Sequence, residues 1–220
     1  MKTVICDLDG TLADTSGDLI AAANACFTAR GHAPQLDEMA DALTAFHGGR
    51  AMLRLGFSRL GRADEADIDA EYPRLLDHYS EHIDVKTKMY PGAVEALEGL
   101  RAEGYALGVC TNKPSELAEK LLFRLGVRDL FGSMIGADTL PVRKPDPMPY
   151  FEAVKRAGGS PEASLLIGDT ETDVKTAQAA GVPVVLVGFG PEGTGVARMV
   201  PDALLMEYDQ LGKVVRTLIG

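Results

Sequence analysis

The 220-residue sequence has no tryptophan, only three cysteines and no long apolar run, and the last two shortages each exclude a class of protein. Three cysteines cannot all pair, and Cys6 and Cys110 lie in apolar runs typical of buried strands, so we expect reduced thiols rather than a disulfide framework. Charged residues, Gly or Pro interrupt every apolar run before the roughly 18 to 20 residues that a membrane helix needs. We therefore expect no membrane-spanning segment.

Basic residues are also scarce, and this bears on the binding partner. Asp and Glu number 32 against 22 Lys and Arg, which gives a net charge of −10. No basic cluster interrupts this excess, so nucleic acids and anionic membranes are disfavoured as partners. A small anion can bind only where a metal ion or a local group of donors overrides the field. The residues after Met1 do not resemble a secretory signal, because they include no apolar segment followed by a small-residue cleavage site, and we expect a cytoplasmic protein.

The composition is otherwise that of a globular protein, 46% hydrophobic and 25% charged. Residues 3–8 form a nearly continuous apolar run, as in a buried parallel strand. Four similar short runs follow at 106–111, 133–136, 164–168 and 183–187, and segments with a helical period lie between them. This alternation predicts an α/β fold, with a Rossmann-like parallel sheet covered by helices.

A stretch of about seventy residues separates the first strand from the others and is too long for a plain loop. Its apolar residues follow a helical spacing between residues 68 and 83, although Pro73 predicts a break or kink there. Gly and Pro clusters divide the stretch into four helices. We therefore expect a catalytic core formed by residues 1–14 and 86–220, and a small all-helical cap domain, 15–85, inserted after the first strand.

Residues that can carry chemistry stand at the predicted strand ends, where ligands bind in open parallel sheets. The first strand ends in Asp7-Leu8-Asp9-Gly10-Thr11, and the second ends in Thr111-Asn112-Lys113. Lys144-Pro145 lies in a later turn, and Gly168-Asp169 is followed by Asp173. Because the carboxyl ends of parallel strands meet at one edge of a sheet, we expect these residues to share one crevice.

Four carboxylates in one crevice, those of Asp7, Asp9, Asp169 and Asp173, repel one another unless a cation lies among them. Oxygen ligands without His or Cys indicate magnesium rather than zinc. Taken singly, each aspartate has a simpler interpretation, because Asp before Gly-Thr makes turns and Asp169 or Asp173 can cap a helix. Their joint occurrence at successive strand ends favours a metal site.

In order and spacing, these four segments resemble the motifs of the haloacid dehalogenase superfamily, and the resemblance covers the whole chain. It is closest to the branch with a small helical cap between the first two motifs. The segments Asp7 to Thr15, His47-Gly48-Gly49 and Lys144 to Pro149 most resemble phosphoglycolate phosphatases. The resemblance implies an Mg²⁺-dependent phosphatase that acts on a small soluble phosphate monoester, with 2-phosphoglycolate as the leading substrate.

The resemblance also implies how catalysis is divided among the aspartates. Asp7 is the expected nucleophile, which forms an aspartyl-phosphate. Asp9 is the expected general acid for the leaving alkoxide and then the general base for water. Mg²⁺ is expected on Asp7, the backbone carbonyl of Asp9 and Asp169, with Asp173 orienting a ligand or water molecule behind them.

Phosphate binding and substrate choice are assigned to other residues in the same way. The Thr111 hydroxyl, the Asn112 backbone amide and the Lys144 ammonium are expected to bind the phosphoryl oxygens. The inserted domain is expected to act as a lid. We expect its loop to select the substrate through His47, Gly48, Gly49 and Arg50. A Gly-Gly turn lets the backbone approach a ligand, and Arg50 could pair with a substrate carboxylate, although a solvated arginine is the alternative.

Several alternatives stay open at this point. A sugar-phosphate mutase similar to β-phosphoglucomutase, a pyrophosphatase and a nucleotidase are compatible with the same motifs. A phosphonate hydrolase is disfavoured, because residues 14–85 contain no lysine for a Schiff base. A non-catalytic binding module is disfavoured, because the aspartates and Lys144 are all present. His78 and His82 are expected to lie on a solvated helix face. The apolar residues Met52, Leu53, Leu55 and Phe57 are expected either in the cap core or at a contact with a second subunit, so a monomer and a homodimer are both possible.

Overall fold

The computed structural model describes residues 1–62 and 64–220. The chain divides into two compact units. The sheet unit consists of Met1–Ala13 and Met89–Gly220, and the helical unit consists of Asp14–Lys88. The chain passes between them through two short strands, β2 (Ala13–Asp14) and β3 (Lys88–Met89), which form a two-stranded sheet.

The sheet unit contains a six-stranded sheet in the order β5-β4-β1-β6-β7-β8, and all its strand pairs are parallel. The strands are β1 (Thr3–Cys6), β4 (Ala106–Cys110), β5 (Ser133–Ile135), β6 (Ser164–Gly168), β7 (Val184–Val187) and β8 (Ala203–Leu205). In the centre, Thr3 of β1 lies opposite Ala106 of β4 and Ser164 of β6. The predicted parallel α/β fold is confirmed.

Two details of the sheet differ from the sequence-based expectation. The first strand ends at Cys6 rather than at residue 8, because the chain turns at Leu8, whose carbonyl accepts hydrogen bonds from the amides of Leu12 and Ala13. The edge strand β8 was not predicted. It has three residues, with no β-branched member, so its sequence carries little strand signal.

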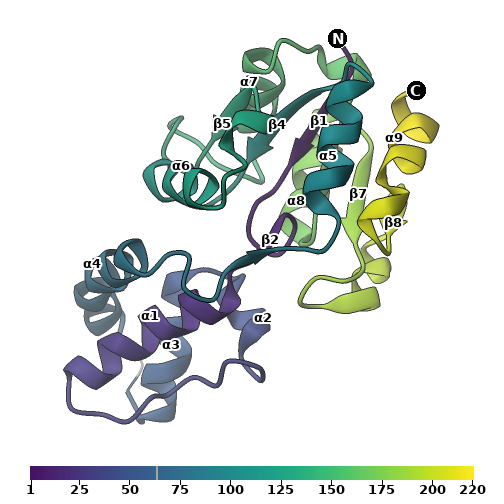
Figure 1. The fold of residues 1–220 in the computed structure, drawn as a ribbon. Coiled ribbons are helices and arrows are strands. Elements are labelled where there is room, and N and C mark those ends of the chain that lie inside the picture. Colours follow the sequence, from purple (N-terminus) through teal and green to yellow (C-terminus); the bar gives the residue numbers. More distant parts are fainter. Residues whose placement is uncertain (63) are drawn as a thin grey trace. The chain divides into compact units, whose positions relative to one another are not determined.

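Helices cover the sheet and bury its apolar residues. They are α5 (Ala93–Ala102), α6 (Ser115–Arg124), α7 (Met148–Arg156), α8 (Glu171–Ala180) and α9 (Leu211–Ile219). In Figure 1, α5 lies in front of the sheet and α8 behind it. Tyr150 of α7 and Val174 of α8 pack with Ile5 and Leu166 of the sheet in one apolar cluster. Within the part of the chain that the structure describes, no helix has the length and apolar character to span a bilayer.

Four 3-10 helices connect these elements: η1 (Arg128–Leu130), η2 (Pro161–Ala163), η3 (Gly193–Met199) and η4 (Tyr208–Gln210). Tyr208 of η4 is buried, and its hydroxyl donates to the Thr11 carbonyl at 2.7 Å. This bond ties the C-terminal part of the chain to the turn that follows β1.

The helical unit contains α1 (Ser16–Ala29), α2 (Ala42–Ala45), α3 (Gly49–Arg59) and α4 (Glu65–Glu81). Its core contains Phe27 and Phe57, whose rings meet edge to face with centroids 5.1 Å apart. Met52 and Leu53 are also fully buried, so they belong to this core and not to a surface contact.

The helix α4 runs through Pro73, so of the break or kink expected at this position the break does not occur. A proline removes one helical hydrogen bond, and packing can offset that loss. Ile68, Leu75 and Tyr79 are buried on both sides of Pro73 and hold the two halves in one helix.

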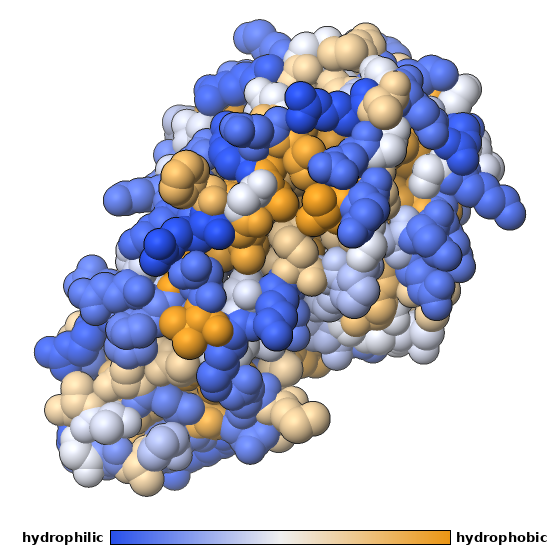
Figure 2. All heavy atoms as spheres, in the orientation of Figure 1, coloured by the Kyte–Doolittle hydropathy of each residue, from blue (hydrophilic) through white to orange (hydrophobic). Residues whose placement is uncertain are grey.

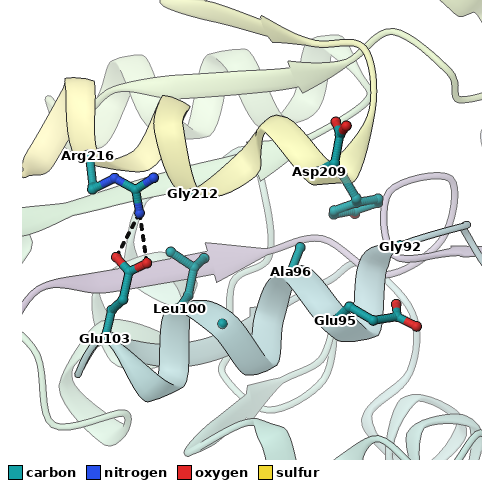
Figure 3. A pocket seen from close by; sticks show the side chains of 10 residues that line it. Gly92, Glu95, Ala96, Leu100, Glu103, Asp209, Gly212 and Arg216 are labelled. Carbon is teal, nitrogen blue, oxygen red and sulfur yellow. Dashed lines mark hydrogen bonds and ion pairs between the residues drawn. The ribbon is translucent and has the colours of Figure 1, made fainter.

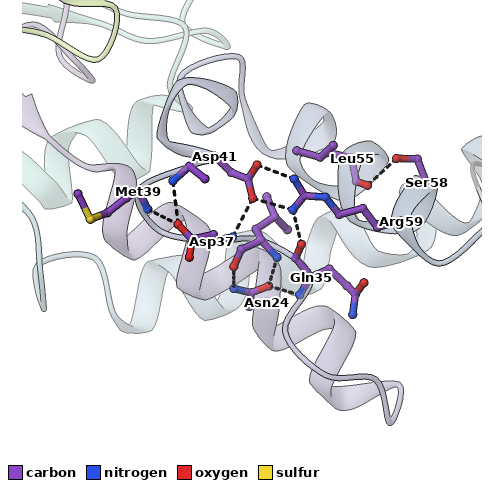
Figure 4. Close-up of polar contacts among 10 residues, drawn as sticks. Asn24, Gln35, Asp37, Met39, Asp41, Leu55, Ser58 and Arg59 are labelled. Atoms are coloured by element: carbon purple, nitrogen blue, oxygen red, sulfur yellow. Dashed lines mark hydrogen bonds and ion pairs between the residues drawn. The ribbon is translucent and has the colours of Figure 1, made fainter.

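A polar network fixes the segment that leads from α1 towards α2 (Figure 4). The Asn24 side chain accepts hydrogen bonds from the amides of Gln35 and Leu36, and it donates to the Leu36 carbonyl. Asp41 accepts two hydrogen bonds from Arg59, both at 2.7 Å. Asp41 precedes α2, so the network positions the segment that continues into residues 46–50.

Asp18 fixes the base of the helical unit. Its buried carboxylate accepts hydrogen bonds from the amides of Lys86 and Thr87 and from the Thr87 hydroxyl, at 2.8 to 3.0 Å. The first turn of α1 is thereby bonded to the segment that returns to β3.

The surface is largely hydrophilic on the face drawn in Figure 2, with apolar side chains between the polar ones. Exposed large apolar residues occur in both units, for example Met39 in the helical unit and Phe123 and Val200 in the sheet unit. They are far apart in the sequence, and single exposed apolar side chains are normal on soluble domains.

Candidate active site

The site begins where the three central strands end. The amide of Asp7, one residue beyond β1, donates to the Ile167 carbonyl of β6 at 2.8 Å. The amide of Thr111, one residue beyond β4, donates to the Ile135 carbonyl at 2.9 Å. Asp169 directly follows β6, so parallel pairing places all three residues at the same edge of the sheet.

Three buried carboxylates converge at this edge. Asp7, Asp169 and Asp173 each offer an oxygen that lies within 4.8 Å of the other two. Asp7 Oδ1 accepts a hydrogen bond from the Leu8 amide at 2.8 Å, and Asp169 Oδ1 accepts one from the Thr11 hydroxyl at 2.9 Å. These bonds fix the orientation of both carboxylates.

Lys144 supplies a positive charge inside this group. Its Nζ lies 2.6 Å from Asp173 Oδ1 and 3.2 Å from Asp7 Oδ1, and the side chain is almost completely buried. The loop that carries Lys144 is held by Asn112, whose side-chain amide donates to the Lys144 carbonyl at 3.0 Å. This hydrogen bond holds the loop with Lys144 next to the turn that contains Asn112.

Asp173 caps a helix, which is one of the roles considered for it, and it also contacts Lys144. Its Oδ2 accepts from the Thr170 hydroxyl and amide, which forms a capping box at the start of α8, while its Oδ1 binds Lys144. A Cβ at residue 168 would lie 2.3 Å from Asp173 Cγ, so this close approach requires Gly168. The sequence did not reveal this requirement.

Burial and mutual repulsion shift the pKa values of these groups. Burial raises the pKa of Asp7 to about 6, with Lys144 opposing the shift and Asp173 and Asp9 adding to it. Burial, followed by the charge of Asp173, raises the pKa of Asp169 well above its usual range. Burial alone would lower the pKa of Lys144, but Asp173 and Asp7 outweigh it and raise that pKa. The cluster therefore holds its negative charge at a free-energy cost, which Lys144 offsets only in part.

Asp9 lies outside the three-carboxylate cluster and is paired differently. Lys113 Nζ donates to Asp9 Oδ1 at 2.7 Å, and the Lys113 side chain is almost fully buried. The Lys113 amide donates to the Thr111 hydroxyl oxygen at 3.2 Å. The proton of the Thr111 hydroxyl can therefore still be donated to an anion. Lys113 was not among the predicted site residues, because a lysine in a turn carries no sequence signal of its partner.

The four predicted specificity residues, 47–50, lie in the helical unit, whereas the aspartates lie in the sheet unit. His47 and Arg50 are exposed, and Gly48 caps α3 with φ at 92°, a conformation that favours glycine. Arg50 forms an ion pair with Asp69, and its guanidinium lies 4.6 Å from the centroid of the Tyr72 ring. Arg50, which was expected either to be solvated or to bind substrate, is thus exposed and already paired with Asp69.

His78 and His82 stack with ring centroids 4.4 Å apart. His82 Nδ1 is bonded to the His78 carbonyl at 3.0 Å. In residues 1–62 and 64–220, neither histidine belongs to a group of three possible metal ligands.

A separate cavity of about 360 Å³ lies between α5, η4 and α9 in the sheet unit (Figure 3). Glu95, Glu103 and Asp209 are among its lining residues, and Arg216 is already paired with Glu103 at 2.7 to 2.8 Å. It shares no residue with the carboxylate cluster, and three of its four charged lining residues are acidic.

Comparison with known proteins assigns the family. The sequence matches the model of the haloacid dehalogenase-like hydrolases over residues 4–187. A phosphoglycolate phosphatase of Rhodospirillum rubrum is 40% identical over 216 residues, which cover 96% of this chain and 89% of the relative. One of Mesorhizobium japonicum is 37% identical over 209 residues, which cover 94% and 92%. The chain therefore belongs to the haloacid dehalogenase-like hydrolase family, and the prediction of a phosphatase of this family is confirmed.

Solved structures agree with this assignment. The crystal structure of a predicted phosphoglycolate phosphatase from Haemophilus somnus is similar with a TM-score of 0.86 and 27% identity, and the match covers 97% of each chain. A haloacid dehalogenase-like hydrolase from Bacteroides fragilis has a TM-score of 0.81 at 23% identity, covering 96% of this chain and 99% of that one, which shows the shared fold.

Proposed function

We propose that this protein hydrolyses small phosphate monoesters with the help of Mg²⁺, and that 2-phosphoglycolate is its preferred substrate. The observation that carries the proposal is the buried Asp7 carboxylate at the end of β1, with Lys144 Nζ 3.2 Å away and Asp169 beside it. A carboxylate nucleophile beside a fixed cation suits attack on a phosphoryl group. The names of the full-length relatives support the choice of substrate.

The residues present fit a magnesium ion. The donor set consists of carboxylate oxygens without His or Cys. Burial and the neighbouring carboxylates raise the pKa values of Asp7 and Asp169, and a bound cation would offset this effect. Asp7, Asp169 and the Asp9 carbonyl would hold the ion, while Asp173, whose oxygens bind Lys144 and Thr170, would orient this set. When bound, Mg²⁺ would neutralise charge on the transferred phosphoryl group.

The chain's own residues account for both chemical steps. An Asp7 oxygen attacks phosphorus, the bond from phosphorus to the leaving oxygen breaks, and Asp9 donates a proton to that oxygen. Asp9 then accepts a proton from water as the water oxygen attacks phosphorus. The bond between phosphorus and Asp7 breaks, which releases inorganic phosphate and restores the carboxylate. The Thr111 hydroxyl, the Asn112 amide and the Lys144 ammonium bind the phosphoryl oxygens.

We further propose that the helical unit serves as a lid and that residues 47–50 select the substrate. The glycine conformation at Gly48 and the network around Asp41 give this segment a defined shape. If Arg50 exchanges Asp69 for a substrate carboxylate, substrate binding is linked to the loss of one exposed ion pair. Such a pair contributes about 1 kcal/mol or less, so the exchange costs little.

The proposal is tested by phosphate release with Mg²⁺ and with chelator, over 2-phosphoglycolate, hexose phosphates, nucleoside monophosphates and pyrophosphate. We expect kcat/KM for 2-phosphoglycolate to exceed the others by orders of magnitude and to vanish with chelator. Arg50→Met should lower kcat/KM for 2-phosphoglycolate more than for a neutral phosphate ester, and Arg62→Met is the matched exposed control in the same unit. Equal, weak turnover of all compounds would contradict the substrate assignment, and no turnover of any would contradict the phosphatase.

A further inference from the structure

Each of the two aspartates at the end of β1 has its own buried lysine. Lys144 lies beside Asp7, and Lys113 lies beside Asp9 at 2.7 Å. The proposed function gives Lys144 a phosphoryl group to bind but leaves Lys113 without a task. Burying an ammonium group costs free energy unless it is well paired, so its placement at this carboxylate calls for an explanation.

The backbone determines where Lys113 can reach. It follows β4 in the turn before α6, and its amide is bonded to the Thr111 hydroxyl oxygen. The Lys113 carbonyl accepts a hydrogen bond from the Ala137 amide at 2.9 Å, which ties the same residue to the loop after β5. The main chain is thus held on two sides, and the side chain extends from a fixed point to Asp9.

Asp9 itself is less constrained than Asp7. The Asp9 side chain is 20% exposed. Among the described residues, the Asp9 carboxylate accepts its hydrogen bond from Lys113. That bond engages Oδ1, which leaves Oδ2 for proton exchange with the substrate. A carboxylate free to rotate would spend part of its time misaligned, and small misplacements of a proton donor reduce the rate strongly.

We propose that Lys113 is a positioning residue, which holds the Asp9 carboxylate by Oδ1 so that Oδ2 faces the leaving oxygen of the substrate. This inference rests on the proposed function, because it assigns Lys113 a role through Asp9. Lys113 does not touch the reacting atoms. Its removal therefore affects the steps in which Asp9 moves a proton and leaves binding of the phosphoryl group in place.

Leaving groups of different acidity separate this role from a structural one. An alkyl phosphate needs a proton on its leaving oxygen, whereas p-nitrophenyl phosphate needs little help. We expect Lys113→Met to lower kcat/KM for an alkyl phosphate about 10- to 100-fold, within the range of coupling between contacting residues. For p-nitrophenyl phosphate the loss in kcat/KM should be about threefold or less, since general acid catalysis contributes little there. KM for the alkyl phosphate should change less than kcat.

A double-mutant cycle with Asp9→Asn tests whether Lys113 acts through Asp9. In the Asp9→Asn background, Lys113→Met should cause little additional loss. Lys113→Arg, which keeps a cationic donor, should recover part of the rate. The control is Lys155→Met, which removes an exposed lysine from α7. If Lys113→Met impairs folding by thermal melting, Lys113→Gln takes its place with a smaller loss of the same kind.

Equal losses for both leaving groups, or losses that add fully to that of Asp9→Asn, would overturn the inference. The proposed function fails separately. If Asp9→Asn itself shows no dependence on the leaving group, the role of Asp9 as general acid is wrong. If Asp9→Asn shows that dependence and Lys113→Met does not, only the role of Lys113 is wrong.

Discussion

Lys144→Met should destabilise the protein through the buried carboxylates that it leaves behind. The ammonium lies 2.6 Å from Asp173 and 3.2 Å from Asp7, and the side chains of Lys144 and Asp173 are at most 1% exposed. Removing one partner of a buried ion pair costs about 3–5 kcal/mol, because the remaining charge stays desolvated. For a chain of this size, that loss corresponds to a fall in Tm on the order of 10 °C.

The measurement is urea unfolding at pH 7 with chelator, repeated with saturating Mg²⁺. Mg²⁺ should reduce the loss, since it supplies part of the missing charge. Adding Asp173→Asn to Lys144→Met should recover stability, because the amide keeps an acceptor for the α8 cap without a buried charge, but it should not recover turnover. Lys155→Met, at an exposed position, should change the unfolding free energy by about 0.5 kcal/mol or less. A loss below about 1 kcal/mol for Lys144→Met would refute this reasoning.

Three further predictions concern the nucleophile, the metal-free cluster and the helical core. Asp7→Asn should abolish phosphate release while circular dichroism shows a folded protein, and near-normal turnover would exclude Asp7 as nucleophile. With chelator, the unfolding free energy should fall as pH rises from about 4 to about 6. The pKa of Asp7 is about 6 in the folded protein and 3.8 in the unfolded chain, so between these pH values the folded state binds more protons than the unfolded state and is stabilised by low pH. Mg²⁺ at 100 times its Kd should then add about 2.7 kcal/mol, and a melting curve that does not respond to Mg²⁺ would count against the site. Gly56→Ala should destabilise the protein by about 1–3 kcal/mol, because its Cβ would lie 2.2 Å from the Phe27 ring. Gly99→Ala, whose Cβ would meet no atom within 4 Å outside its chain neighbours and the nearby backbone of its own helix, should be neutral or stabilising.

The parallel sheet and the strand-end location of the site could be predicted from the sequence, because both follow from periodicity. Buried strands such as β1 and β6 are continuous apolar runs, and polar residues directly after them must meet at one edge. Of the four carboxylates expected in one crevice, the structure groups those of Asp7, Asp169 and Asp173, with Lys144 beside them, whereas the Asp9 carboxylate lies outside this group. The roles of these residues stay predictions until the variants are measured.

Contacts that depend on three-dimensional pairing could not be predicted. The lysine beside Asp9 is 104 positions away in sequence, and the hydroxyl of Thr11 reaches Asp169 across 158 positions. The continuous α4 shows the same limit, since the local cost of Pro73 was visible and the packing of Ile68 and Leu75 was not. Strand β8 was missed because tertiary pairing with β7 compensates for its weak sequence signal.

The central claim is that Asp7 carries the phosphoryl group between the two steps, and Asp9→Asn with p-nitrophenyl phosphate tests it most directly. This leaving group departs without a proton, whereas the hydrolysis of the intermediate still needs a base. The variant with Mg²⁺ should therefore release a burst of p-nitrophenol and accumulate a phosphorylated protein. Peptide mass spectrometry after an acid quench should place the phosphoryl group on Asp7, and Asp7→Asn/Asp9→Asn should remain unlabelled. A phosphoryl group on any other residue, or a burst without a phosphorylated peptide, would contradict the account.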